Sequence, residues 1–392
     1  MIAFEKALEL ISTDVIQTAA ERVGLHAALC RVLAEDVFSD IDMPPFDKSA
    51  MDGYACRRED LGNELEVMAV LAAGEPAVRE IGPHQCIKVM TGAMIPGGAD
   101  LVIMVEETAE TSPGKIRFTG EKPKINISFR GEEVKAGHLV LKKGIQIMPR
   151  HMAVLASVGC VNPLVARQPV VAVLSTGDEL VEPGLFPPEG KIRNSNGLQL
   201  TAQVRAAHCI PNYMGIVADQ EEVTRQMIGK ALNENDVVIL SGGVSVGDFD
   251  FVPKVMRELG VNIVFQKVAV KPGRPTVFGR TDRSYIFGLP GYPVSSYINF
   301  ELMVKPLLYR MMGNSFQSLT VPMQLARDFS RKKADRPEWL PVCLDGHGKV
   351  IPVSYMGSAH IHAISLADGL IVIPQGTNSI LKDETVAFRP FV

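Results

Sequence analysis

The pattern of apolar and polar positions changes character several times along the chain. In the first 35 residues, apolar side chains recur at three- and four-residue steps from Phe4 to Ile16, which predicts helix. Pro44 ends this character, because proline interrupts a helix. Between residues 46 and 145 the pattern consists of short β-like runs separated by glycine and proline turns. This spacing predicts a small barrel or sandwich.

A different pattern follows a further helical stretch at 149–158 and extends from residue 169 to residue 312. Continuous apolar runs at 170–174, 237–240 and 285–289 alternate there with segments of helical periodicity. Strands that are apolar on both faces and alternate with helices predict a mostly parallel sheet covered on both sides. The expected helices cover residues 196–208, 220–232, 251–259 and 294–311.

The changes of pattern divide the chain into four parts. A helical part comprises residues 1–45 together with 145–168, and a β part, residues 46–144, is inserted into it. An α/β part covers residues 169–312, and a strand-rich part covers 313–392. A length of 392 residues agrees with several separate cores, since domains average about 150 residues. The predicted fold class is therefore multidomain, α/β plus β.

Composition and charge favour neither a nucleic-acid nor a membrane partner. The 40 basic and 44 acidic residues give a net charge of −4, so no overall field favours a nucleic-acid partner. The six cysteines contain no C-x-x-C spacing, which indicates reduced thiols. No signal-peptide pattern opens the chain, and no apolar run approaches the roughly 18 residues that span a bilayer. We expect a cytoplasmic protein without a membrane partner.

Glycine-containing loops follow three of the predicted parallel strands, at Ser175–Glu179, Ser241–Asp250 and Pro290–Pro293. Ligands of such sheets bind beyond the carboxyl ends of the strands. Glycines let the backbone approach a ligand, and a helix that follows favours phosphate. Any one of these loops is equally well an ordinary strand-to-helix turn. Three on the same edge favour a binding site.

Charged residues add chemistry to this edge. The carboxylates of Asp178, Glu179, Asp248 and Asp250 would repel a phosphate unless a bridging Mg²⁺ bound both. Lys267 and Lys271 fall on one face of a predicted strand, and Arg274 follows in a turn. The alternative for the lysines is a solvated pair on an edge strand.

Two earlier segments also hold candidate polar residues. The proline-led loop at 43–55 carries Asp47 and Asp52, and a β run ends in Thr91-Gly92. Both segments are also compatible with a purely structural role at the entry to the β part. His360 and His362 lack partners in a metal-ligand spacing and are interpreted as structural.

Six motifs occur in the order typical of one family. The chain resembles the molybdopterin molybdenumtransferases, the bacterial counterparts of the gephyrin E domain, over essentially its whole length. The α/β part alone is also similar to the molybdopterin-binding domains of adenylyltransferases and of the competence-damage-inducible family. The motifs are PFDKSAMDGYA (45–55), MTGAMIP (90–96), STGDEL (175–180), SGGVSVGDFD (241–250), KPGRP (271–275) and GLPGYPVS (288–295).

This resemblance implies an elongated helical domain that dimerises, an inserted β domain, a molybdopterin-binding α/β domain and a C-terminal β barrel. It implies a homodimer whose active site is shared between the α/β domain of one subunit and the early loops of the other. The implied reaction inserts molybdate into adenylylated molybdopterin with Mg²⁺-dependent hydrolysis of the adenylate, and it releases molybdenum cofactor and AMP. Transient contacts with a molybdopterin adenylyltransferase and with cofactor acceptors follow from such a reaction.

The resemblance also assigns roles to individual residues. Asp250 and Asp248 are the implied metal ligands. The implied catalytic residues are Asp52, Thr91, Glu179, Asp219 and Asp250. The implied substrate-binding residues are Gly242, Gly243, Ser245, Lys267, Lys271, Pro290, Pro293 and Ser358.

The chain departs from the family pattern at several positions. Tyr292 stands where the family usually has asparagine, Lys48 where bacterial members often have asparagine, and Glu133 where aspartate is common. The strand near residues 336–342 does not place an arginine where relatives carry one for molybdate.

Two other functions compete with this interpretation. One is adenylylation of molybdopterin with ATP, but the resembling enzymes need only the α/β unit for that reaction. The other is a scaffold of the gephyrin type, but the chain carries no additional linker or interaction tail.

Overall fold

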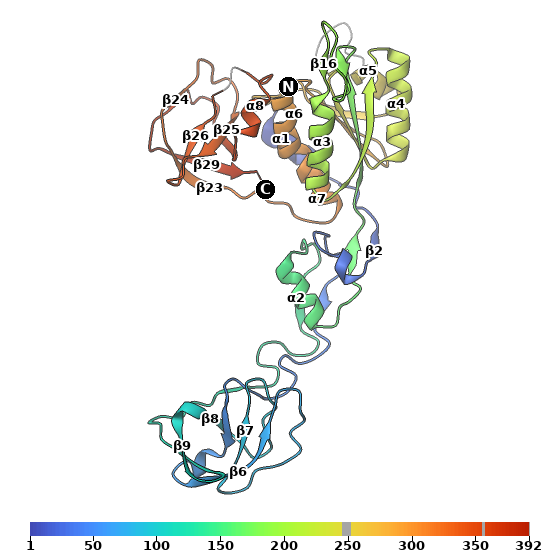
Figure 1. The fold of residues 1–392 in the computed structure, drawn as a ribbon. Coiled ribbons are helices and arrows are strands. Elements are labelled where there is room, and N and C mark those ends of the chain that lie inside the picture. Colours follow the sequence, from blue (N-terminus) through green and yellow to red (C-terminus); the bar gives the residue numbers. More distant parts are fainter. Residues whose placement is uncertain (245–251, 355–356, 392) are drawn as a thin grey trace.

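The computed structural model describes residues 1–244, 252–354 and 357–391. The molecule is elongated, with a β domain at one end and a narrow middle segment that joins it to two larger bodies (Figure 1). Within the described residues, no helix combines the length and apolarity that a membrane crossing requires. The α-helices are α1 (Phe4–Ser12), α2 (Pro149–Ser157), α3 (Ser195–Ala206), α4 (Glu221–Glu234), α5 (Val252–Glu258), α6 (Pro293–Asn299), α7 (Lys305–Met311) and α8 (His362–Ser365).

A six-stranded sheet forms the centre of the α/β domain. Its first four strands are parallel to one another, and the fifth pairs antiparallel with both the fourth and the sixth. Helices α3, α6 and α7 contribute to the core on one face, and α4 and α5 to the core on the other (Figure 1). The prediction of a mostly parallel, doubly covered sheet is confirmed. The strand order is β17 (Ile210–Val217), β14 (Val170–Thr176), β18 (Val237–Ser241), β22 (Tyr285–Leu289), β21 (Val277–Arg280) and β19 (Asn262–Phe265).

The four helices expected in this domain are present, with one difference. The segment expected as a single helix over 294–311 consists of α6, a π-helical turn at Phe300–Val304 and then α7. The π-helical turn ends immediately before Lys305-Pro306, and proline lacks the N–H group that continues a regular α-helix.

The N-terminus belongs to the core of this domain. Strand β1 (Ile2–Ala3) pairs in parallel with β20 (Val268–Ala269), and α1 buries Phe4, Ala7 and Ile11 in the same core as α7. Helix is therefore confirmed at the start of the first 35 residues, but the prediction is wrong for most of the remainder. Long-range strand pairing replaces local helix there, because backbone pairing and burial outweigh weak intrinsic propensity.

Paired short strands and α2 form the middle segment. Strand β2 (Ala20–Arg22) pairs with β13 (Leu164–Ala166), and β3 (Val37–Phe38) pairs with β12 (Leu139–Leu141). A 3₁₀ turn at Leu25–Ala27 packs near α2. The chain thus crosses this segment twice, once before and once after the β domain.

The β domain contains a six-stranded sheet, in agreement with the expected short strands. Its order is β8 (Leu101–Met104), β5 (Gly53–Cys56), β7 (Gln85–Val89), β6 (Glu64–Leu71), β10 (Lys115–Phe118) and β9 (Thr108–Ser112). A small ladder of β4 (Lys48–Ser49) and β11 (Ile127–Ser128) lies beside it.

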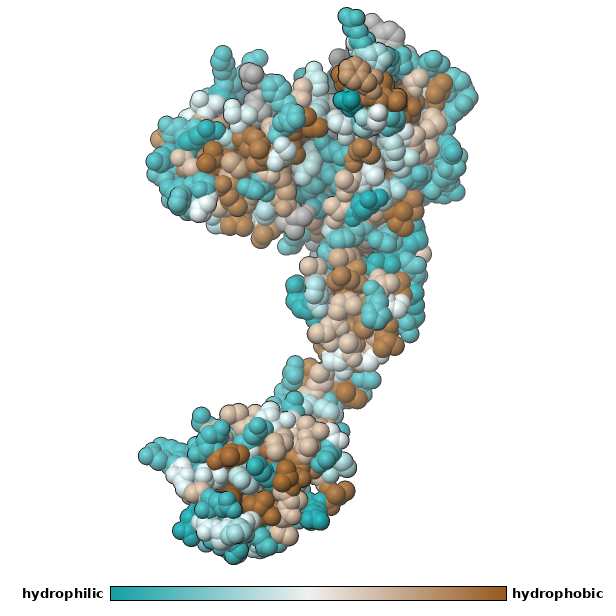
Figure 2. Space-filling model, viewed as in Figure 1, coloured by the Kyte–Doolittle hydropathy of each residue, from teal (hydrophilic) through white to brown (hydrophobic). Residues whose placement is uncertain are grey.

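The C-terminal domain is a closed barrel, as the resemblance implies. The barrel strands are β23 (Val321–Leu325), β26 (Lys349–Pro352), β25 (Glu338–Leu344), β27 (Gly369–Ile373) and β29 (Thr385–Pro390), with the pair β24 (Phe329–Ser330) and β28 (Ser379–Ile380) outside it. A parallel bridge between Lys271 and Glu338 joins the α/β domain to the barrel. The space-filling view shows the two domains in contact and the β domain set well apart from them (Figure 2).

Candidate functional site

Two neighbouring cavities open at the carboxyl ends of the parallel strands. The first, here called the strand-end cavity, has a volume of about 570 Å³ and is lined by the ends of β14 and β18, the start of α3 and Asp219. The second, here called the cationic cavity, has a volume of about 920 Å³ and lies between the 271–275 turn and the barrel. The loop after β22 separates them, and Tyr292 lines both.

Glycine geometry shapes the floor of the strand-end cavity. Gly242 and Gly243 follow β18 with φ of 96° and 65°, a region that residues with a Cβ rarely adopt. A Cβ on Gly242 would also lie 2.6 Å from the Thr176 carbonyl oxygen. Only glycine therefore lets β18 turn this close to β14.

Two buried polar atoms at this cavity lack a hydrogen-bond partner within the described chain. They are Thr176 Oγ1 and Asn196 Oδ1, and both residues line the cavity. The Asn196 amide nitrogen is used, because it donates to the Gly291 carbonyl at 2.8 Å. Both oxygens are enclosed in the cavity wall, so they are exceptions to the rule that buried polar atoms are paired.

Carboxylates gather at the rim of the strand-end cavity. Glu179 is exposed there, and Asp219 is half-buried. The Asp178 backbone N–H donates to Asp219 Oδ2 at 3.2 Å, and the Asp219 N–H donates to Asp178 Oδ1 at 3.1 Å. These reciprocal bonds join the loops after β14 and β17 and bring Asp178 and Asp219 together. Ser245, Asp248 and Asp250 lie outside the described residues.

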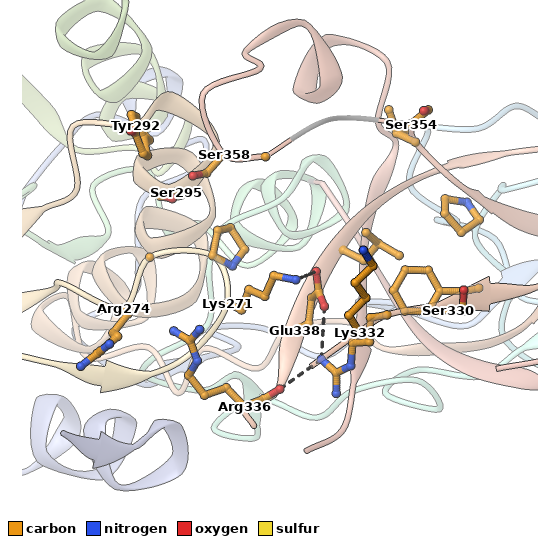
Figure 3. Close-up of a pocket in the computed structure, with 18 of the residues that line it drawn as sticks. Lys271, Arg274, Tyr292, Ser295, Ser330, Lys332, Arg336, Glu338, Ser354 and Ser358 are labelled. Carbon is orange, nitrogen blue, oxygen red and sulfur yellow. Dashed lines mark hydrogen bonds and ion pairs between the residues drawn. The ribbon is translucent and has the colours of Figure 1, made fainter. Parts of the chain in front are cut away.

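Positive charge dominates the second cavity. Six cationic side chains line it against the carboxylates of Asp328 and Glu338 (Figure 3). Lys271 Nζ lies 2.8 Å from Glu338 Oε1, so one of the predicted lysines is at the site. Pro290 and Ser358 also line the cavity, and the Ser358 carbonyl accepts the Val294 N–H at 3.1 Å. The cations are Lys271, Arg274, Arg327, Arg331, Lys332 and Arg336.

Lys267 is separated from Lys271. It lines neither cavity, and its carbonyl accepts the Ile2 N–H at 3.0 Å where β1 joins β20. The paired strand covers only Val268–Ala269, so it does not carry both lysines along one face. Sequence periodicity assumed a longer strand than the chain forms.

Asp52 and Thr91 lie in the β domain, remote from both cavities of the same chain (Figure 1). The antiparallel pairing of β5 with β7 brings them together, and Asp52 Oδ1 accepts the Thr91 N–H at 2.6 Å and its hydroxyl at 2.8 Å. The backbone N–H of Thr91, and then its hydroxyl, hold the pKa of Asp52 below its usual value. Two predicted residues thus form one exposed pair, with an ionised carboxylate at neutral pH.

Most of the barrel residues in the cationic cavity are not predictable as site residues from the motifs. Arg327, Arg331, Lys332 and Arg336 come from one basic stretch before β25. Such a stretch usually indicates a solvated surface, and only the closure of the barrel against the α/β domain turns it inward. The sequence signal that could have identified these residues is the density of positive charge within ten residues.

Comparisons with known proteins agree along the whole chain. Residues 2–159 match the MoeA N-terminal region (domains I and II), residues 172–310 the probable molybdopterin-binding domain, and residues 323–391 the MoeA C-terminal region (domain IV). The molybdopterin molybdenumtransferase of Staphylococcus epidermidis is 37% identical over 386 residues, covering 96% of this chain and 92% of that protein. Its namesake in Haemophilus influenzae is also 37% identical, covering 95% of this chain and 94% of that protein.

Solved structures of MoeA proteins also match this chain over its whole length. A molybdopterin biosynthesis MoeA protein from Pyrococcus horikoshii is 32% identical and superimposes with a TM-score of 0.87, with both chains covered completely. A second structure of a MoeA protein from that source, 34% identical, gives 0.84 and covers 100% of this chain and 99% of the other. The identity extends across every domain, and the fold matches throughout. This chain therefore belongs to the molybdopterin molybdenumtransferase family.

Proposed function

We propose that this protein inserts molybdenum from molybdate into adenylylated molybdopterin, hydrolysing the adenylate and releasing molybdenum cofactor and AMP. The observation that carries the proposal is the pair of adjoining cavities at the strand ends, in a chain of this family. One cavity offers polar side chains beside a glycine turn, and the other offers concentrated positive charge. A substrate with a heterocycle and phosphates, together with an oxyanion, matches that division.

The strand-end cavity would bind the molybdopterin part of the substrate. Polar side chains of Asn194, Ser195 and Asn196 line it and suit the hydrogen-bonding groups of a heterocycle, and the turn at Gly242–Gly243 lets phosphate approach the backbone. The cationic cavity would bind molybdate through Lys271 and neighbouring arginines, since charge-assisted bonds to an oxyanion are the strong ones.

Mg²⁺ fits the donor chemistry at the rim. Glu179 and Asp219 offer carboxylate oxygens at the cavity, which suits a cation that takes one or two carboxylates plus phosphate oxygens. No cluster of three or more potential ligands occurs among residues 1–244, 252–354 and 357–391, so the phosphate itself and Asp250 would have to complete the site. When bound, Mg²⁺ would neutralise phosphate charge. In the hydrolysis, the exposed carboxylate of Glu179 would accept a proton from water. Asp219 would hold the loop that positions Glu179.

A homodimer with a shared active site is part of the proposal. Asp52 and Thr91 lie at the opposite end of the molecule from the strand-end cavity of their own chain (Figure 1). Two-fold pairing would bring one subunit's pair to the other subunit's cavity. Transient contacts with a molybdopterin adenylyltransferase and with cofactor acceptors belong to the same proposal, because the substrate must be delivered and the product removed.

The test is incubation of the full-length protein with adenylylated molybdopterin, Mg²⁺ and molybdate, followed by measurement of AMP and of protein-bound or released molybdenum cofactor. We expect both products in wild type and a loss of AMP release of at least tenfold in Glu179→Gln, which keeps the size of the side chain but removes the charge. Glu234→Gln, at the far end of α4, is the matched control. Formation of adenylylated molybdopterin from ATP and molybdopterin, with no cofactor formed, would instead indicate an adenylyltransferase.

A further inference from the structure

Glu338 brings negative charge into the cationic cavity. It opens strand β25, it is only 4% exposed, and its side chain lines the cavity together with Leu340 from the same strand. Strand β25 therefore presents a carboxylate and an apolar residue to the cavity, and no cation. Burying a carboxylate beside an oxyanion site is costly unless the carboxylate has a specific partner.

Two cations hold this carboxylate, one of them buried in the protein and the other accessible from the cavity. Arg331 Nη1 lies 3.2 Å from Glu338 Oε2, and the other Arg331 nitrogens donate to the carbonyls of Thr377 and Pro374 at 2.8 and 2.6 Å. Arg331 is 3% exposed in its side chain, so its role is to fix the barrel end. It is tied into the protein and has little capacity left for a ligand.

Lys271 differs because it remains accessible. Its side chain is 45% exposed, and its ammonium carries three donors, of which one is directed to Glu338 at 2.8 Å. The backbone is fixed as well, since Lys271 N–H donates to Pro337 O at 3.0 Å and Trp339 N–H donates to Lys271 O at 2.7 Å. Glu338 thus holds the ammonium against the barrel, with its remaining donors available to the cavity (Figure 3).

From this arrangement we infer that Glu338 sets the anion affinity of the cavity: it positions the Lys271 ammonium and partly neutralises it. The inference rests on the proposed oxyanion site. A dianion bound to Lys271 would meet the nearby carboxylate charge, so the pair limits how tightly any oxyanion is held. A limited affinity suits a site that must pass molybdenum on to the strand-end cavity rather than retain it. Glu338 is a specificity-determining residue in this scheme.

The test is molybdate binding to the full-length protein by calorimetry at constant ionic strength. Glu338→Gln keeps the shape and the acceptor for Lys271 but removes the charge, so we expect molybdate to bind about tenfold more tightly. The same substitution should raise the affinity for perchlorate, a monoanion, by a smaller factor, because the Coulomb interaction scales with the charge of the anion. Glu384→Gln, an exposed change on the same barrel, is the matched control and should leave both affinities as in wild type.

Further variants separate charge from position. Glu338→Asp retains the charge and should bind molybdate within about threefold of wild type, whereas a purely positioning role predicts loss with both variants. In Lys271→Gln, Glu338 keeps its Arg331 partner, so the fold should persist while molybdate binding weakens. The increase in molybdate affinity caused by Glu338→Gln should be smaller in the Lys271→Gln background, since the two residues are coupled.

The possible failures can be distinguished. Weaker or unchanged molybdate binding by Glu338→Gln, in a protein whose wild type binds molybdate, would overturn the inference and leave the proposed function intact. Absence of molybdate binding by both proteins would contradict the proposed oxyanion site, and the inference with it.

Discussion

Thr91 influences the protonation state of Asp52. Thr91 donates twice to the same carboxylate oxygen, and these bonds lower the pKa of Asp52. A lowered pKa means that Asp52 stays ionised to a lower pH than an ordinary aspartate. Any activity that needs this anion should therefore persist further toward acid pH than it otherwise would.

Replacing Thr91 with valine removes the hydroxyl donor and keeps the backbone donor, which makes the larger contribution. We expect the pKa of Asp52 to rise but to remain below its ordinary value, and the acid limb of the activity profile to move to higher pH. Carboxyl carbon NMR titration of Asp52 measures the shift directly. Thr111→Val removes a hydroxyl that donates to Glu64 in the same sheet, and it should leave Asp52 unchanged. Identical Asp52 titrations in Thr91→Val and wild type would show that the hydroxyl bond is not formed.

At the scale of elements, the turn after β18 decides the shape of the strand-end cavity. Gly242→Ala would place a methyl group 2.6 Å from a backbone oxygen at a φ of 96°. We expect a loss of about 1–3 kcal/mol in the free energy of unfolding and a marked loss of pterin binding, since the turn must move. Urea unfolding and fluorescence titration with a pterin provide the measurements.

Gly184→Ala is the control for this turn, because it has open space and no positive φ. It should change neither the stability nor the affinity by much. If Gly242→Ala bound pterin as wild type does, the strand-end cavity would not be the pterin site.

An aromatic contact joins helix α1 to the C-terminal barrel. The Phe4 ring lies 5.7 Å from the Trp339 ring, edge to face, and Phe4 is 7% exposed within the main core. Phe4→Ala should cost about 3–5 kcal/mol in the free energy of unfolding, through lost burial and the cavity that remains. Trp339 is the single tryptophan of the chain, so its fluorescence reports the same change locally.

The exposed change Glu9→Ala on the same helix should alter stability by less than about 0.5 kcal/mol. An unchanged tryptophan spectrum in Phe4→Ala would contradict the docking of α1 onto the barrel.

At the scale of the whole molecule, the long separation of the β domain from the cavities gives the shared-site proposal its sharpest test. Asp52→Ala and Glu179→Gln should each abolish most activity alone. Mixed under conditions that exchange subunits, they should recover some, because a hybrid dimer has one intact site and one site with both lesions. Each hybrid should reach at most about half of the wild-type rate, by counting sites under two-fold symmetry.

In the control, each variant undergoes subunit exchange with itself. Native mass spectrometry measures whether hybrid dimers form in the mixture of the two variants. Hybrids that form and show no recovery would exclude a site shared in this way.

Elements with strong periodicity, and their order, followed from the amino-acid pattern alone. Strands β14, β18 and β22 were predictable because both of their faces are buried, so their apolar runs are uninterrupted. The glycine loops after them indicated the cavity edge for the same local reason, since left-handed backbone requires glycine. The motifs indicated the family, because six of them occur in one order between residues 45 and 295.

Which charged side chains meet depends on how the domains pack together. The basic stretch before β25 and the carboxylate of Glu338 reach Lys271 because the barrel docks on the turn at 271–275, a contact between segments far apart in the sequence. The same holds for residues 13–35, where pairing with segments more than a hundred residues away replaces the expected helix. Periodicity records which face of an element is buried, but it carries no information on which distant element covers that face.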